Sequence, residues 1–104
     1  MTDFDYKQLD DIIHSRIRLA IISVLISVEE ADFKFLKTSV NATDGNLSIH
    51  LKKLENAGYI SVDKSFVDRK PLSKYKLIDK GRLAFSKYVE RLESMIKGQV
   101  ISNK

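Results

Sequence analysis

Residues 43–60 constrain the fold of this chain more than any other segment. Three leucines repeat there at the spacing of one face of an α-helix, namely Leu47, Leu51 and Leu54. Thr43 precedes them as a favourable N-cap, and Gly58 follows as a C-cap in the left-handed region that side chains with a Cβ adopt only at a cost. The pattern predicts a capped amphipathic helix over residues 43–57, and then a strand.

Three further helices are expected before this segment. The first spans residues 6–14, and the second begins after Ser15 and continues to about Val28. The second helix is apolar nearly all round, which is typical of a central core helix. Asp32 is a suitable N-cap for a third, short helix. This helix and the next one, joined by a tight turn, form a helix-turn-helix over residues 32–58.

A β-hairpin is expected downstream, over residues 59–78. Its strands cover residues 59–66 and 72–78, and the turn covers residues 67–71, with Pro71 at the tip because proline cannot donate a ladder hydrogen bond. The residues expected to face the core are Ile60, Val62, Phe66, Tyr75 and Leu77. A final helix over residues 79–98 follows, capped by Asp79.

These elements predict one domain over residues 1–104, mainly α with a small β-hairpin (α+β). This is the layout of a winged helix-turn-helix, with the hairpin as its wing and with N- and C-terminal helices available for dimerisation. The chain has 104 residues and no cysteine, so disulfides and thiolate metal sites are excluded. No metal site or cofactor is expected. The acidic N-terminus is unlike a signal peptide, no apolar run is long enough to span a membrane, and a cytoplasmic location is expected.

Charge is unevenly placed along the chain. Residues 33–82 carry eleven Lys and Arg against five Asp and Glu, whereas residues 1–32 carry three against seven. The helix-turn-helix and the hairpin therefore lie in the basic part, which favours a polyanionic partner. The sequence shows neither a nucleophile beside a base nor a glycine loop that would cradle phosphate, so no enzymatic activity is expected.

Four segments resemble the winged-helix transcriptional regulators of the MarR and ArsR type. They are residues 13–22, 47–60, 66–71 and 75–81, and the resemblance covers roughly residues 10–90. It implies the winged-helix fold and binding to double-stranded DNA. The cysteine-rich metal-sensing motif of many ArsR-type proteins is missing, so metal sensing does not carry over. No effector pocket is recognisable in the sequence, and an effector remains unknown.

The predicted recognition helix offers polar groups that suit the major groove. Asn46, Ser48 and His50 are placed to meet base edges or phosphates, and Ile49 to pack on a thymine methyl group. In the wing, Arg69 and Lys70 are placed for the minor groove or the backbone. The full expected DNA-binding set is Thr43, Gly45, Asn46, Ser48, Ile49, His50, Lys53, Lys64, Arg69, Lys70 and Lys74. The alternative is that these residues do not contact DNA. The helix residues would then only form a solvated face, and the charges of the hairpin would only keep it soluble and unpaired.

Gly45, in the first turn of the recognition helix, has two explanations. The first is close approach of the backbone to a phosphate or to the preceding helix. The second is that a first helical turn simply tolerates glycine. The sequence does not choose between them.

The final helix predicts a homodimer. Its apolar residues follow the three-and-four spacing of a coiled-coil seam, and an N-terminal group offers a second surface. The expected interface is Phe4, Leu9, Ile12, Phe85, Tyr88, Val89, Leu92, Met95 and Ile96. The alternative is that this stripe packs only on its own domain.

The expected function is a sequence-specific, double-stranded DNA-binding transcriptional regulator, acting as a homodimeric repressor on a pseudo-palindromic operator. Helix 43–57 would enter the major groove, and residues 66–72 would touch the minor groove or the backbone. The alternatives are a winged-helix module that binds protein and a non-specific architectural DNA binder.

Overall fold

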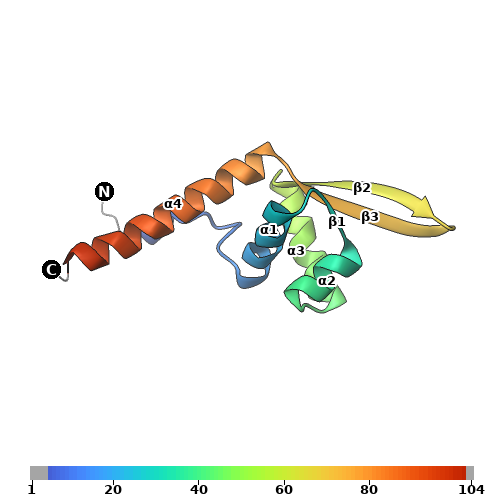
Figure 1. The fold of residues 1–104 in the computed structure, drawn as a ribbon, viewed down its shortest axis with the longest axis horizontal. Helices are drawn as coiled ribbons and strands as arrows, with labels where there is room; N and C mark the ends of the chain where they lie inside the picture. Colours follow the sequence, from blue (N-terminus) through green and yellow to red (C-terminus); the bar gives the residue numbers. More distant parts are fainter. Residues whose placement is uncertain (1–4, 103–104) are drawn as a thin grey trace.

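The computed structural model describes residues 5–102, without the side chains of residues 98–102. It contains four α-helices and a three-stranded antiparallel sheet, which confirms the expected fold (Figure 1). Its elements are η1 (Tyr6–Gln8, a 3₁₀ turn), α1 (Arg16–Ser27), β1 (Ala31–Asp32), α2 (Phe33–Val40), α3 (Asp44–Asn56), β2 (Ile60–Val67), β3 (Lys70–Leu77) and α4 (Asp79–Ser102). The molecule measures 61 × 24 × 21 Å, and the hairpin and α4 extend from opposite ends of a small helical body.

The helical body is built around α1, as its apolar sequence predicts. Ile21, Ile22 and Leu25 of α1 are buried together with the three leucines of α3. Among the described residues, no polar or charged residue is classed as buried. Apolar burial is therefore the main source of stability for this small domain.

The predicted N-caps of the three helices in the body are confirmed. The side chains of Ser15, Asp32 and Thr43 accept hydrogen bonds from backbone N–H groups in the first turns of α1, α2 and α3. Gly58 has a φ of 80°, as expected of a residue that ends a helix in the left-handed region. Local side-chain chemistry thus fixes where each helix starts and where α3 gives way to the hairpin.

The predicted helix over residues 6–14 is wrong. Only Tyr6–Gln8 forms a 3₁₀ turn, and the chain then bends at Asp10. The Asp10 carboxylate accepts hydrogen bonds from the backbone N–H groups of Ile12, at 2.8 Å, and Ile13, at 3.0 Å. An aspartate that bonds to nearby backbone offers an alternative to the helical ladder, which explains the difference.

The hairpin turn is shorter than predicted. It consists of Asp68 and Arg69, both with positive φ (51° and 66°), which is the pattern of a type I′ turn. Pro71 therefore does not lie at the tip but within β3, opposite Phe66. Val67 and Lys70 flank the two-residue turn, and residues in that position exchange backbone hydrogen bonds. The next pair in the ladder, Phe66 and Pro71, does not, so the missing N–H of Pro71 removes no hydrogen bond to β2.

The far half of the hairpin extends beyond the core. Phe66 is 76% exposed, so the expectation that it faces the core is wrong. A strand that the sequence pattern did not indicate, β1, pairs with β3 through only two residues, giving the order β1-β3-β2. The hairpin is thus supported only at its base, where β3 pairs with β1 and the strands pack on the core.

The start of α4 is pressed against the start of the hairpin. The backbone N–H of Ile78 donates to the carbonyl oxygen of Tyr59 at 3.1 Å. A Cβ at Gly81 would overlap that oxygen and lie 2.8 Å from the carbonyl carbon and 2.9 Å from Leu77 Cδ1. Only glycine allows this approach without a shift of the backbone.

Two tyrosine hydroxyls tie the N-terminal segment to the rest of the fold. Tyr59 donates to the Asp10 carboxylate at 2.5 Å, and the Tyr88 hydroxyl lies 2.9 Å from Nδ1 of His14. Burial, then the hydrogen bond and the charge of Asp10, raise the pKa of Tyr59 to about 12.

Within residues 5–102, none of the helices has the length and apolar character needed to cross a membrane.

We expect Gly81→Ala to destabilise the fold by about 2 kcal/mol, because the added methyl group meets backbone and cannot be accommodated by a side-chain rotation. The measurement is the free energy of unfolding in urea. Gly45→Ala is the matched control, since a Cβ there meets nothing within 4 Å. Equal stability of Gly81→Ala and the parent chain would contradict the close packing of α4 on Tyr59.

We expect one tyrosine to ionise near pH 12 in an ultraviolet titration of the folded chain, and this component to disappear in Tyr59→Phe. Because the folded-state pKa lies above the unfolded value of about 10, the stabilisation is complete below pH 10 and is lost as pH rises towards 12. Titration of every tyrosine near pH 10 in the folded chain would refute the bond to Asp10.

Candidate nucleic-acid interface

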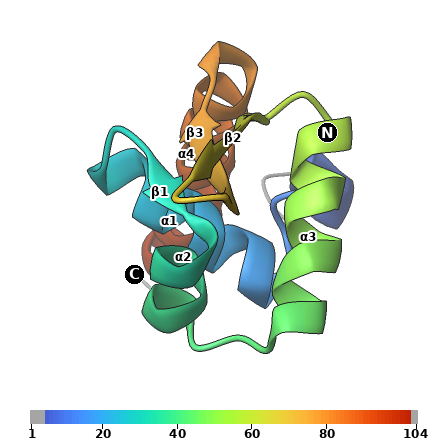
Figure 2. The ribbon, with the colours of Figure 1, turned by 90° about the vertical axis from the view of Figure 1, so that its right-hand side faces the viewer.

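Helix α3 presents a defined outward face. Its three leucines point into the core, so at 100° per residue the opposite side carries Gly45, Ile49, Lys52, Lys53 and Asn56. Ile49 is 56% exposed although it is apolar. The expected thymine-contacting residue therefore stands near the centre of the outward face. Seen along the hairpin, α3 forms one side of the body (Figure 2).

The three polar residues predicted to act together do not share one surface. Asn46 and His50 are four residues apart and lie on the same edge of α3, whereas Ser48 is about 200° of helical rotation from His50. Asn46 and Ser48 are exposed, and His50 is half-buried. Thr43 acts through its side chain as the N-cap, accepting from the backbone N–H of Asn46 at 3.2 Å.

His50 contacts an arginine that sequence reasoning did not select. Nη1 of Arg18, in α1, lies 2.8 Å from Nδ1 of His50. Partial burial, followed by the charges of Arg18 and Lys53, lowers the pKa of His50. The only signal in the sequence was the basic pair at the start of α1, and its partner on α3 is 32 residues away.

The first turn of α3 is held by α2. Lys37 pairs with Asp44 at 2.7 Å, across the turn that joins the two helices. This pair places a cation beside the acidic residue nearest the N-terminus of α3. The open space around Gly45 gives no support to close packing against α2, so the explanation left for this glycine, besides tolerance, is approach to a phosphate.

The lysines of the hairpin arms lie on opposite faces. Lys64 stands opposite Ser73, whereas Lys74 stands opposite Asp63, one position along the ladder. Lys74 also pairs with Glu30 at 3.2 Å, so its charge is compensated at the base of the hairpin. Lys64, Arg69 and Lys70 are exposed towards the tip. Lys64, Arg69 and Lys70 thus form a group of exposed cations on the half of the hairpin that lies away from the body.

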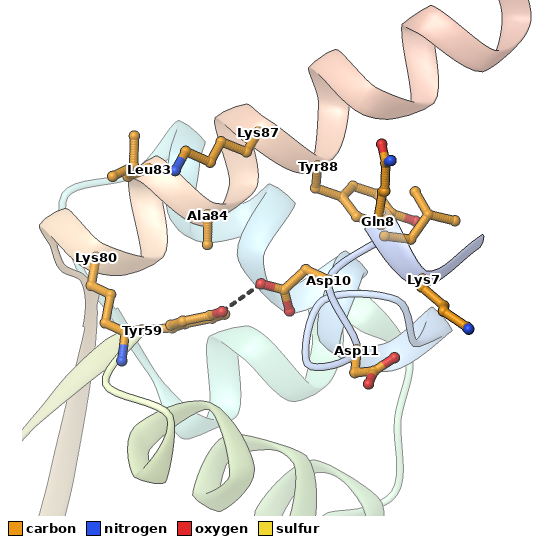
Figure 3. A pocket seen from close by; sticks show the side chains of 11 residues that line it. Lys7, Gln8, Asp10, Asp11, Tyr59, Lys80, Leu83, Ala84, Lys87 and Tyr88 are labelled. Carbon is orange, nitrogen blue, oxygen red and sulfur yellow. Dashed lines mark hydrogen bonds between the residues drawn. The ribbon is translucent and has the colours of Figure 1, made fainter. Parts of the chain in front are cut away.

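A pocket of about 500 Å³ lies between the N-terminal segment and α4 (Figure 3). Tyr59, Asp10 and Tyr88 line it, and Lys80 stands at its edge with Nζ 5.9 Å from the centre of the Tyr59 ring. The hydrogen bond between Tyr59 and Asp10 crosses its inner wall. No local sequence pattern indicates this pocket, because residues from three separate segments form it.

Helix α4 carries an apolar stripe that the rest of the described chain leaves exposed. Val89 is 42%, Leu92 37% and Ile96 58% exposed, at the spacing of one helical face. Phe85, Met95, Leu9 and Ile12 are half-buried. Tyr88 is only 5% exposed and belongs to the core of its own chain, which leaves little of its side chain for the predicted interface. Phe4 lies outside the described residues.

Comparisons with known proteins agree with this geometry. Residues 17–96 match the family described as winged helix DNA-binding domain. An uncharacterized protein of Methanocaldococcus jannaschii is 37% identical over 86 residues, which cover 83% of this chain and 94% of that protein.

Two solved structures are similar in fold. A protein of Pyrococcus horikoshii, described as a transcriptional regulator homologue, superimposes with a TM-score of 0.85 at 25% identity, covering 95% of this chain and 98% of the other. The Salmonella typhimurium protein ytfH, a candidate transcriptional regulator, gives a TM-score of 0.68 at 20% identity, covering 88% and 83%. The family match spans the helix-turn-helix, the hairpin and most of α4, and the chain therefore belongs to the winged-helix DNA-binding domain family.

Proposed function

We propose that this chain is a sequence-specific, double-stranded DNA-binding transcriptional regulator that acts as a homodimeric repressor. The observation that carries the proposal is the exposed outward face of α3, with Ile49 at its centre and Asn46 and Lys53 beside it. Family membership supports DNA as the partner, and the similar Pyrococcus horikoshii protein is described as a transcriptional regulator homologue. The MarR or ArsR type is part of this proposal.

The geometry of α3 fits the major groove. A helix with its side chains is about 10–12 Å across, and the groove is about 12 Å wide. Ile49 would contact a thymine methyl group, Asn46 an adenine edge, and Lys53 a phosphate. Ser48, on the other edge of α3, would contact the opposite wall of the groove.

The wing adds a second contact. In the segment over residues 66–72, the cations Arg69 and Lys70 lie at the end of a hairpin that projects beyond the helices. They would contact phosphates or enter the minor groove next to the major-groove site. Lys64 would support them, whereas the pairing of Lys74 with Glu30 makes that lysine a weaker contact.

The stripe of α4 is proposed as the dimer interface. Val89, Leu92 and Ile96 would pack against the same residues of a second copy across a two-fold axis. The two α3 helices would then meet successive major grooves, about 34 Å apart on the duplex. A dimer bound over a promoter would exclude polymerase, which gives repression.

A second function has one observation in its favour. Phe66, at 76%, and Val67, at 52%, are exposed on the hairpin, and apolar groups in such a position also suit a protein partner. A winged helix that binds protein would use this surface without any need for DNA.

Binding to duplexes selected from a random pool, followed by fluorescence anisotropy at several salt concentrations, tests the proposal. Arg69→Ala/Lys70→Ala should weaken binding and reduce the salt slope by about 1 to 2, because up to two phosphate contacts are lost. Lys97→Ala on α4 is the control for loss of a surface charge. Absence of binding at low salt would leave the protein-binding alternative.

Asn46→Ala should reduce the preference for one base pair by about 1–3 kcal/mol and leave binding to unrelated duplexes almost unchanged. The measurement is competition among single-position variants of the selected duplex. An equal loss on all duplexes would indicate a non-specific architectural binder instead.

Light scattering should give twice the monomer mass at micromolar concentration, and Leu92→Glu/Ile96→Glu should return the monomer, because charges would be buried in the stripe. Glu93→Gln, a change at an exposed carboxylate paired with Lys97, serves as the control. A monomeric parent chain would exclude this mode of dimerisation.

A further inference from the structure

Arg18 is fixed in place before it reaches α3. Its Nε donates to the carbonyl oxygen of Ile12 at 2.5 Å, and Nη2 donates to the carbonyl oxygen of Asp11 at 3.4 Å. Both carbonyls belong to the turn that the Asp10 carboxylate closes. The guanidinium is therefore held by backbone, and the remaining nitrogen, Nη1, is directed at His50.

This contact decides the chemistry of the imidazole. A guanidinium has only donors, so Nδ1 of His50 must accept the hydrogen bond. A ring nitrogen that accepts carries no proton, and the neutral imidazole then has its proton on Nε2. The contact with Arg18 thus specifies both the charge and the tautomer of His50.

The surrounding charges act in the same direction. The charged groups that influence His50 are Arg18 of α1 and Lys53 of α3 itself, both positive. The N-terminal turn contributes carbonyl oxygens, which are already used by Arg18. Together with partial burial these charges lower the pKa of His50, so the neutral ring is the form present at pH 7.

We propose that Arg18 is a positioning residue for DNA recognition, which holds His50 as a neutral Nε2–H donor directed at a hydrogen-bond acceptor of the duplex. The inference rests on the proposed function. The acceptor is either a base-edge atom, such as guanine N7 or O6, or a phosphate oxygen. If the acceptor is a base edge, the N–H donor discriminates against positions that present only a donor, such as the amino group of cytosine, whereas a contact to phosphate fixes the position of α3 on the duplex.

The free protein tests the positioning role without DNA. Long-range ¹H–¹⁵N spectra at pH 7.5 should show His50 with an unprotonated Nδ1 and a protonated Nε2. Arg18→Met should give a mixture of tautomers and raise the pKa of His50, whereas Arg16→Met, a change at an exposed arginine of the same turn, should alter neither. An unchanged tautomer and pKa in Arg18→Met would overturn the proposal.

Matched variants of His50 test its use on DNA. Glutamine places an amide donor near the position of Nε2, so His50→Gln should bind the selected duplex almost as the parent chain does. His50→Asn, whose amide reaches only the position of Nδ1, and Arg18→Met should each weaken binding about tenfold, as expected for loss of one charge-assisted or well-placed hydrogen bond. The double variant should lose little more than either single one.

The two acceptor sources give different results. Replacement of one guanine by 7-deazaguanine should abolish the effect of His50→Asn if N7 is the acceptor, and a neutral methylphosphonate at one position should do so if a phosphate is. If His50→Asn binds as tightly as the parent chain, the role on DNA is refuted. Failure of the parent chain to bind any duplex would instead refute the proposed function, and the spectra would still decide the positioning role.

Discussion

The contacts of Tyr59 hold the separate parts of this molecule in one arrangement. Its carbonyl oxygen accepts from Ile78 at the end of the hairpin, and the first turn of α4 packs on the same carbonyl group because residue 81 is glycine. Its hydroxyl group donates to the Asp10 carboxylate, and that carboxylate also accepts the backbone hydrogen bonds of the N-terminal turn. The carbonyl oxygens of this turn accept hydrogen bonds from Arg18. The directions of the wing, of α4 and of the N-terminal segment therefore depend on one residue just after α3.

This arrangement would let such a small domain make both of the proposed kinds of DNA contact. The helical body is stabilised by apolar burial, and the polar contacts lie on its surface or at the junctions between elements. The hairpin carries Lys64, Arg69 and Lys70 away from the body, whereas Lys74 at its base is paired with Glu30. The proposed recognition by α3 and the proposed electrostatic attraction by the wing tip would therefore be separated in space, and each could be altered without the other.

The parts that sequence reasoning predicted correctly depend on local chemistry. Ser15, Asp32 and Thr43 cap helices through bonds to residues three positions away, and Gly58 adopts a positive φ that glycine allows without a steric cost. The leucine spacing of α3 likewise predicts its buried face from the helical repeat alone. These signals are short-range, so one sequence is enough to recognise them.

The parts that it missed depend on the tertiary structure or on competing local bonds. The bend at Asp10 replaces a helix, and Asp68 and Arg69 form a tight turn without the glycine that would have marked it. The bond between Arg18 and His50 joins residues 32 apart, and it sets His50 apart from Asn46 and Ser48. The spacing of Tyr88 predicts a position in the seam, but its burial and its contact with His14 place it in the core.

The most direct test of the account is a chemical footprint of the protein on a duplex selected from a random pool. Two protected major-groove segments, centred about 10 base pairs apart and each flanked by minor-groove protection, are predicted for two copies of α3 and the wing related by a two-fold axis. A single uninterrupted protected segment without a two-fold pattern, or no protection at all, would contradict a dimeric, sequence-specific regulator.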